Sequence, residues 1–383
     1  MIATRARAFL AAALLGAVPA AAAPTPSPAR IQVAIVHQAE SAVIEADGDV
    51  RVVAPGGKTS PLEWKGALTL RPREGGLKLS KLRLASETRL EPKEGGTIKV
   101  GADRYRGTLI LRLDPGQTVT VVEDVSIEEY LEGVLPFEMD PDWPLEALKA
   151  QAVVARSFAY ANMGKFRKDG FDLTADTRSQ MYRGVTAVND NVRRAVRETR
   201  GEVLGWNGQL LRVYYHACCG GRTENAAEAW GGDPKETPRP LRGVRDPWCR
   251  TSPLMHWTAY FAWQDLMTAI EERHDLPGPL KSLKIGRRDI AGYVRTFTAR
   301  AGRGQLEIKA PELRTGLGAA ELKSTRIARL VVKKKGLEFI GSGSGHGVGL
   351  CQWGARIQAE KGRSYERILH FYFPGADLSE VAQ

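Results

Sequence analysis

The feature that most constrains the fold is a change in the spacing of apolar residues near Ser126. Between residues 31 and 127, short runs alternate apolar and polar side chains, and Gly-rich turns at 74–76 and 94–96 separate them. This alternation is typical of half-buried β-strands. The segment SIEEYLEG, which starts at Ser126, has helical spacing instead. The sequence therefore predicts a small antiparallel sheet or barrel followed by a mixed region, which is an α+β fold.

Helical and strand patterns both occur beyond this point. A longer helix is expected from Pro144 to about Lys165, and another from Asn189 to Thr199, where Asn189 or Asp190 can cap the first turn. Asn207-Gly208 predicts a tight hairpin. Further on, the patterns predict a helix near 263–273, several strands, and two helices close to the C-terminus.

The first 23 residues have the pattern of a signal peptide. Arg5 and Arg7 precede an apolar run from Ala8 to Val18, and Ala21 to Ala23 provide small residues for cleavage. No later segment reaches the roughly 18 apolar residues expected of a membrane helix. We therefore expect an exported protein of the periplasm or cell wall without a transmembrane anchor.

The charge of the chain is strongly positive. The 383 residues are 43% hydrophobic and 26% charged, which argues against disorder, and the formal net charge is +11. Without the two leader arginines the charge is about +9, which favours polyanionic partners. Nucleic acid is not expected for an exported protein, whereas anionic wall polymers and lipid head groups fit that compartment. A charge that serves only solubility remains an alternative.

The chain has four cysteines: Cys218, Cys219, Cys249 and Cys351. An even number in an oxidising compartment predicts disulfides, and the adjacent pair would bridge outward, one to Cys249 and the other to Cys351. The alternative is a zinc site that also draws on His216 and His346. Because no CxxC or HxxxH spacing occurs, we expect disulfides, with no metal and no cofactor.

One carboxylate lies in unusual surroundings. Glu138 is flanked by Pro136, Phe137 and Met139 and precedes the turn Pro-Asp-Trp-Pro. Apolar surroundings raise the pKa of a carboxyl, so Glu138 is a candidate general acid. The alternative is that it only caps the local turn. Asp140 and Asp142 could form a hydrolytic pair, although capping of the next helix is the ordinary use of such residues.

Two further segments could carry chemistry. One is YYHACCGGRTENAAEAWGG at 214–232, and the other is GSGSGHGVGLCQWGA at 341–355. The second matches neither nucleotide-binding pattern, GxxxxGK[ST] or GxGxxG. Its glycines allow the backbone to approach a ligand closely and leave His346 unshielded.

Together these segments resemble the SpoIID/LytB family. The family pattern GVVPSEMP-x-x-WP-x-EALKAQAVAAR-[ST]-YA corresponds to Gly133–Ala159, FHSxxGGxTEN-x-x-x-xW to Tyr215–Trp230, and GxGHGVGxSQ[YW]GA to Gly343–Ala355. Cys351 occupies a position where Ser is common. TADTRSQMYRG at 174–184 is also similar to the family. The resemblance predicts a β-rich unit at 24–104, a SpoIID/LytB-like region at 105–375 and a tail at 376–383.

The resemblance implies action on peptidoglycan. The expected activity is a lytic transglycosylase that cleaves between N-acetylmuramic acid and N-acetylglucosamine and leaves a 1,6-anhydro end, with Glu138 as acid and base. The alternatives are a non-catalytic enhancer of a wall amidase and a zinc-dependent wall hydrolase. The expected partners are glycan strands and, in the enhancer case, an amidase. The expected substrate contacts are Gln180, Tyr182, His216, His346 and Gln352, and Trp230, Trp353 or Tyr215 could stack on a sugar.

Overall fold

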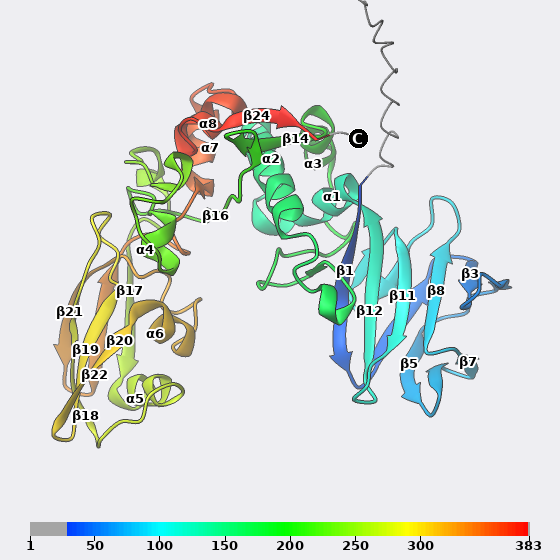
Figure 1. The fold of residues 1–383 in the computed structure, drawn as a ribbon, viewed down its shortest axis with the longest axis horizontal. Helices are drawn as coiled ribbons and strands as arrows, with labels where there is room; N and C mark the ends of the chain where they lie inside the picture. Colours follow the sequence, from blue (N-terminus) through cyan, green and yellow to red (C-terminus); the bar gives the residue numbers. More distant parts are fainter. Residues whose placement is uncertain (1–28, 382–383) are drawn as a thin grey trace, which may run out of the picture.

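The computed structural model describes residues 29–381 and confirms the α+β fold with a β-rich N-terminal part (Figure 1). The predicted signal peptide, residues 1–23, lies outside the described residues. Among residues 29–381, none of the helices has the length and apolar character needed to cross a membrane.

Two packed sheets form the N-terminal part, at one end of the molecule in Figure 1. The larger has the strand order β13-β1-β12-β11-β8-β3-β4 and the smaller β10-β9-β2-β5-β6-β7. Contacts of β12 with β5 and of β11 with β6 join them. The strands are β1 (Arg30–Ala39), β2 (Ala42–Ala46), β3 (Val50–Val53), β4 (Thr59–Leu62), β5 (Leu68–Arg73), β6 (Gly76–Leu79), β7 (Leu82–Leu84), β8 (Glu87–Pro92), β9 (Ile98–Val100), β10 (Asp103–Tyr105), β11 (Thr108–Leu113), β12 (Val119–Ser126) and β13 (Leu173–Thr174).

The larger sheet crosses the predicted boundary at residues 104 and 105. Strand β12 is paired antiparallel with β1 along nearly its whole length, with Arg30 opposite Ser126. Strands β11 and β12 therefore belong to the same sheet as the first strand of the chain. The β-rich part ends at Ser126, where the helical region begins.

Three helices follow and pack on one another in the centre of the molecule: α1 (Ile127–Glu138), α2 (Leu145–Asn162) and α3 (Asp190–Glu198). Ser126 caps α1 by accepting the Glu129 N–H at 3.3 Å. Asn189 caps α3 by accepting the Val192 N–H at 3.0 Å, as predicted. The fully buried Arg156 of α2 binds Glu128 of α1 through two hydrogen bonds, of 2.9 and 2.7 Å. This ion pair connects the first two helices.

The predicted hairpin at Asn207-Gly208 joins β14 (Glu202–Trp206) to β15 (Gln209–Leu210). Both turn residues have positive φ, 53° for Asn207 and 74° for Gly208, as the Asn-Gly signal requires. The segment predicted as a tail contains β24 (Asp377–Glu380), which pairs with β14. Before it, α7 (Gln352–Glu360) and α8 (Tyr365–Tyr372) pack against α2.

A second compact unit lies at the other end of the molecule in Figure 1 and has its own apolar core. It is inserted in the sequence between the second and third motif segments, and Phe297, Phe339 and Ile308 are among its buried residues. Its elements are β17 (Trp257–Ala262), α5 (Trp263–Glu271), β18 (Leu280–Ile285), β19 (Thr296–Ala301), β20 (Gly304–Lys309), α6 (Ala310–Gly316), β21 (Ile327–Lys333) and β22 (Gly336–Gly341). The sequence predicted α5 and the strands β18 to β21, but not α6, β17, β22 or the separate core.

Candidate active site

Glu138 is the last residue of α1 and is partly buried. Its Oε1 accepts the backbone N–H of Met181 at 3.0 Å. Burial raises the pKa of Glu138, while the hydrogen bonds from Met181 and from the Tyr215 hydroxyl oppose that rise. Glu138 therefore has the environment of a carboxyl that can hold a proton above the pH at which an exposed glutamate loses it.

A chain of side-chain hydrogen bonds positions Tyr215 beside Glu138. The Tyr130 hydroxyl donates to Oε1 of Gln180 at 3.1 Å, and Nε2 of Gln180 donates to the Tyr215 hydroxyl at 3.2 Å. The Tyr215 hydroxyl is then free to donate to the Glu138 carboxylate. Gln180 is 1% exposed, so in this structure it orients Tyr215 rather than meeting a ligand.

Tyr215 belongs to β16 (Tyr215–His216), which pairs in parallel with β23 (Leu350–Cys351). Side chains of successive strand residues point to opposite faces, so Tyr215 and its neighbours at 214 and 216 face different sides. The two short strands bring the second and third motif segments together, although they are far apart in the sequence. Gly349 permits this approach, since a Cβ there would overlap the Tyr214 carbonyl and its φ is 76°.

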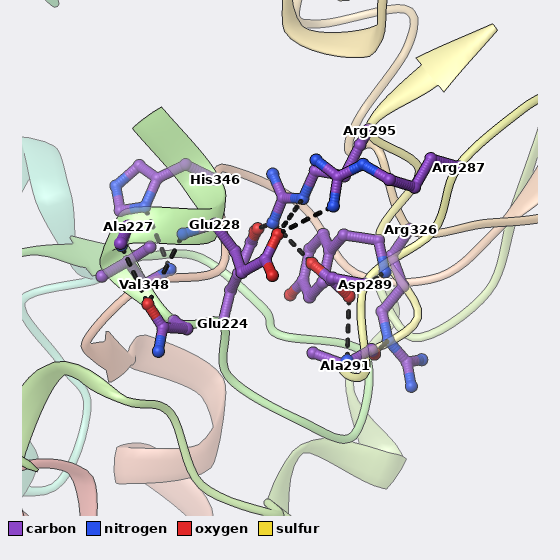
Figure 2. A network of polar contacts seen from close by, with 12 residues as sticks. Glu224, Ala227, Glu228, Arg287, Asp289, Ala291, Arg295, Arg326, His346 and Val348 are labelled. Atoms are coloured by element: carbon purple, nitrogen blue, oxygen red, sulfur yellow. Dashed lines mark hydrogen bonds and ion pairs between the residues drawn. The ribbon is translucent and has the colours of Figure 1, made fainter. Parts of the chain in front are cut away.

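His346 lies on the other side of β16, against an aromatic group. Its ring centroid is 5.4 Å from that of Trp230 and 5.6 Å from that of His216. Its Nδ1 accepts the Val348 N–H at 3.1 Å (Figure 2). The imidazole also forms a hydrogen bond with the Tyr215 backbone. Burial lowers the pKa of His346 to about 3, so this imidazole is neutral at physiological pH.

His216 is also neutral, because burial lowers its pKa to about 4. Its Nδ1 hydrogen bonds to the Val348 carbonyl at 3.1 Å, and the buried Nε2 has no partner among the described residues. Trp230, with 51% of its surface exposed, is the most accessible member of this group. A sugar could therefore reach Trp230 more easily than either histidine.

Two of the expected substrate contacts are enclosed by the protein. Tyr182 is 3% exposed, its ring packs against Tyr130, and its hydroxyl donates to Glu123 at 2.5 Å. Gln352 is 6% exposed, and its nearest side-chain partner is Gln151 of α2, at 3.5 Å. The Tyr182 hydroxyl is therefore already hydrogen-bonded to a buried carboxyl.

Asp140 and Asp142 have local roles. Oδ1 of Asp140 accepts the Asp142 N–H at 3.0 Å, and Oδ1 of Asp142 accepts the Asn189 side chain at 3.1 Å. Neither caps α2, whose N-cap residue is Pro144. The expectation of helix capping by these residues is therefore wrong, and their contacts stabilise the turn between the first two helices.

The four cysteines are free and buried, so the predicted disulfides are not formed in this structure. The Sγ atoms of Cys219 and Cys249 lie 3.4 Å apart, much farther than the roughly 2.05 Å of a disulfide bond. The sequence correctly indicated that Cys249 and Cys351 lie close to the adjacent pair Cys218 and Cys219. It did not indicate that the thiols are free.

A buried ionic network joins the second motif segment to the inserted unit (Figure 2). The Arg295 guanidinium contacts Glu224 and lies 2.5 Å from Asp289. Burial lowers the pKa of Arg295 to about 10, which leaves it charged at neutral pH. The Tyr293 hydroxyl adds a hydrogen bond of 3.0 Å to the Cys219 carbonyl. The segment Thr223–Asn225, which contains Glu224, is thus bound to the inserted unit beside the site.

Sequence reasoning missed two contributors to the site, Tyr130 and Met181, and also the buried Glu123 that binds Tyr182. Tyr130 binds Gln180, and Met181 binds Glu138; each contact joins segments that are distant in sequence. Glu123 did carry a signal, because it occupies the same strand face as the apolar Val121 and Val125 of β12. A charged residue at such a position is expected to have a specific buried partner.

Comparison with known proteins agrees with this arrangement. The family model described as "Stage II sporulation protein", SpoIID, matches residues 115–206, which include Glu138, Gln180 and Met181. An uncharacterized protein of Brachyspira hyodysenteriae is 32% identical over 306 residues, which are 79% of each chain. The chain belongs to the SpoIID family.

Two relatives have names that indicate a role. The amidase enhancer of Bacillus subtilis is 31% identical over 297 residues, which are 65% of this chain and 40% of the relative. Stage II sporulation protein D of Bacillus amyloliquefaciens is 28% identical over 283 residues, which are 68% of this chain and 76% of the relative.

Proposed function

We propose that this protein is a peptidoglycan lytic transglycosylase that cleaves between N-acetylmuramic acid and N-acetylglucosamine. The observation that carries the proposal is the environment of Glu138, a partly buried carboxyl whose pKa is raised by burial and which Met181 and Tyr215 hold in place. A general acid needs a proton at working pH and a fixed orientation. Membership in the SpoIID family supports the assignment.

The proposed reaction needs only one carboxyl. Glu138 donates its proton to the glycosidic oxygen as the C1–O bond breaks, and the C6 hydroxyl of the same muramic acid attacks C1. The carboxylate then takes the proton from that hydroxyl, which closes the 1,6-anhydro ring and restores the acid. A hydrolytic glycosidase requires a second carboxyl.

Tyr215 has a supporting role in this proposal. Its hydroxyl donates to the carboxylate form of Glu138 after the first proton transfer and so stabilises the charge that develops there. Gln180 keeps the hydroxyl in that orientation. Trp230 supplies an exposed ring on which a pyranose could stack. The protein acts outside the cytoplasm in this proposal, with peptidoglycan as its partner.

Enhancement of a wall amidase is the second candidate function. The name of the Bacillus subtilis relative favours it, although the chain spans only 40% of that relative. In this case the same surface would bind glycan strands without cleaving them, and the positive charge of the chain would favour binding to an anionic wall.

Digestion of purified glycan strands distinguishes the candidates. We expect cleavage by the wild type, and a rate at least about 100-fold lower for Glu138→Gln, because general acid–base catalysis contributes that much or more. Asp140→Asn is the matched control, since Asp140 is exposed and lies two residues away. No cleavage by the wild type, together with faster release of stem peptides by an added amidase, would support the enhancer instead.

A further inference from the structure

Four buried sulfur atoms gather where three segments of the chain meet. Cys218 and Cys219 follow β16, Cys249 lies in the short helix η3 (Trp248–Thr251), and Cys351 ends β23. All four side chains are at most 1% exposed. Four thiols from three separate segments that share one enclosed position require a chemical explanation, because thiols alone pack no better than other small apolar groups.

The spacing of the donor atoms fits a metal ion better than disulfide bonds. The Sγ atoms of Cys219, Cys249 and Cys351 and a carboxylate oxygen of Asp246 all lie within 4.8 Å of one another. Cys218 also contacts the sulfurs of Cys249 and Cys351. With a Zn–S bond of about 2.3 Å, a tetrahedral site separates its sulfurs by about 3.8 Å. The Cys219–Cys249 separation of 3.4 Å is close to that value.

The surroundings favour thiolates. The Cys219 N–H donates to the Cys351 sulfur at 3.3 Å, and the Gly221 N–H donates to the Cys219 sulfur at 3.4 Å. Cys351 is also the N-cap residue of α7, where the helix dipole favours negative charge. Backbone donors of this kind orient and stabilise metal-bound thiolates.

Asp246 fits a position outside the first ligand sphere. Its Oδ1 accepts the Trp248 N–H at 2.8 Å, and its Oδ2 accepts the Tyr372 hydroxyl at 2.9 Å. Oδ2 also accepts the Cys219 thiol at 3.2 Å, so both oxygens are hydrogen-bonded. Cys218 is a buried thiol in contact with two of the other sulfurs. His216 binds the Val348 carbonyl through Nδ1, and the donor atoms that lie within 4.8 Å of one another do not include its Nε2. Four sulfurs can thus supply a tetrahedral set of ligands, with Asp246 beside them.

We propose that Cys218, Cys219, Cys249 and Cys351 together bind one divalent zinc-type cation in a closed structural site. Binding releases the thiol protons, and four thiolates fill the tetrahedral shell, so no position remains for a water that could attack a substrate. The ion would hold β16 against β23 and thereby keep Tyr215 next to Glu138. This assignment differs from the zinc-dependent hydrolase considered from the sequence, which needs an open position.

The full-length protein, purified without reductant or chelator, provides the test. We expect native mass spectrometry to show one zinc per chain, and alkylation after denaturation with chelator to modify all four cysteines. Replacement of zinc by Co²⁺ should give the intense visible absorption of tetrahedral thiolate coordination. A chain lighter by four hydrogens, with two disulfides and no metal, would overturn the proposal. So would four free thiols that retain neither metal.

Two variants distinguish a zinc site made of four sulfurs from one in which a histidine is a ligand. Cys249→Ser should lower zinc retention in a chelator competition at least tenfold, while His216→Asn should leave it unchanged. Equal loss of zinc in both variants, with native circular dichroism, would contradict the four-sulfur ligand set. If either variant does not fold, the metal content, thiol count and Co²⁺ spectrum of the wild type decide the question alone.

Discussion

At the scale of single residues, the site consists of one carboxyl and the groups that control its proton. Burial raises the pKa of Glu138, and the hydrogen bonds from Met181 and Tyr215 make this rise smaller. The pKa of Glu138 sets the upper limit of the pH range in which it can act as an acid. Cleavage should therefore decline as the pH rises through the pKa of Glu138 in the folded protein.

The variant Tyr215→Phe tests the control of this proton. In the wild type the Tyr215 hydroxyl lowers the pKa of Glu138. Its removal should therefore raise that pKa and move the alkaline limb of the pH–rate profile to higher pH. The rate at the optimum should fall about tenfold, since a hydrogen bond to a charged group is lost. Tyr260→Phe, at an exposed position of the inserted unit, should change neither quantity. An unshifted profile for Tyr215→Phe would contradict the contact.

At the scale of secondary-structure elements, β12 carries a buried carboxyl of its own. Glu123 accepts the Gly107 N–H at 2.8 Å and the Tyr182 hydroxyl, and burial raises its pKa to about 7. The ordinary pKa of a glutamate is 4.5. Between these values the folded protein binds more protons than the unfolded chain, so its stability falls as the pH rises through this range.

The variant Glu123→Gln should flatten this dependence. For the wild type we expect the free energy of unfolding to fall by up to about 3 kcal/mol between pH 4.5 and pH 7 through this carboxyl alone, and denaturant titrations at several pH values measure it. The variant should lose that component. Glu94→Gln, on an exposed turn, is the control and should keep the wild-type slope. Parallel curves for the wild type and Glu123→Gln would refute the assignment.

Local signals predicted elements well, and contacts between distant segments poorly. The Asn207-Gly208 turn, the Asn189 cap and the strand alternation depend on neighbouring residues, so the sequence alone was sufficient. The Tyr215–Gln180 contact and the pairing of β24 with β14 depend on how the whole chain folds. The motifs indicated that Glu138 was important, but no spacing rule could show that Tyr182 is enclosed while Trp230 is exposed.

At the scale of the whole molecule, the β-rich part and the inserted unit lie at opposite ends, with the helices and the candidate site between them (Figure 1). The inserted unit has a separate core, and polar contacts of Arg295, Arg326 and Tyr293 join it to the second motif segment. Arg295 is the central residue of those contacts, because it is 6% exposed and interacts with both Glu224 and Asp289.

The variant Arg295→Met should loosen the inserted unit. Removing one partner of a buried ionic cluster leaves the others unpaired and costs about 3–5 kcal/mol. We expect earlier proteolytic cleavage near residues 285–296 and a lower free energy of unfolding. Arg300→Met, on the exposed face of β19, should behave like the wild type. Equal protease resistance of both variants would show that the network does not hold the unit.

The most direct test of the central claim is digestion of glycan strands in water enriched in ¹⁸O, followed by mass analysis of the new ends. If Glu138 serves as the single acid and base for ring closure, the products should carry 1,6-anhydro ends without ¹⁸O, and Glu138→Gln should form almost none of them. Reducing ends that contain ¹⁸O would show attack by water and contradict the proposed mechanism.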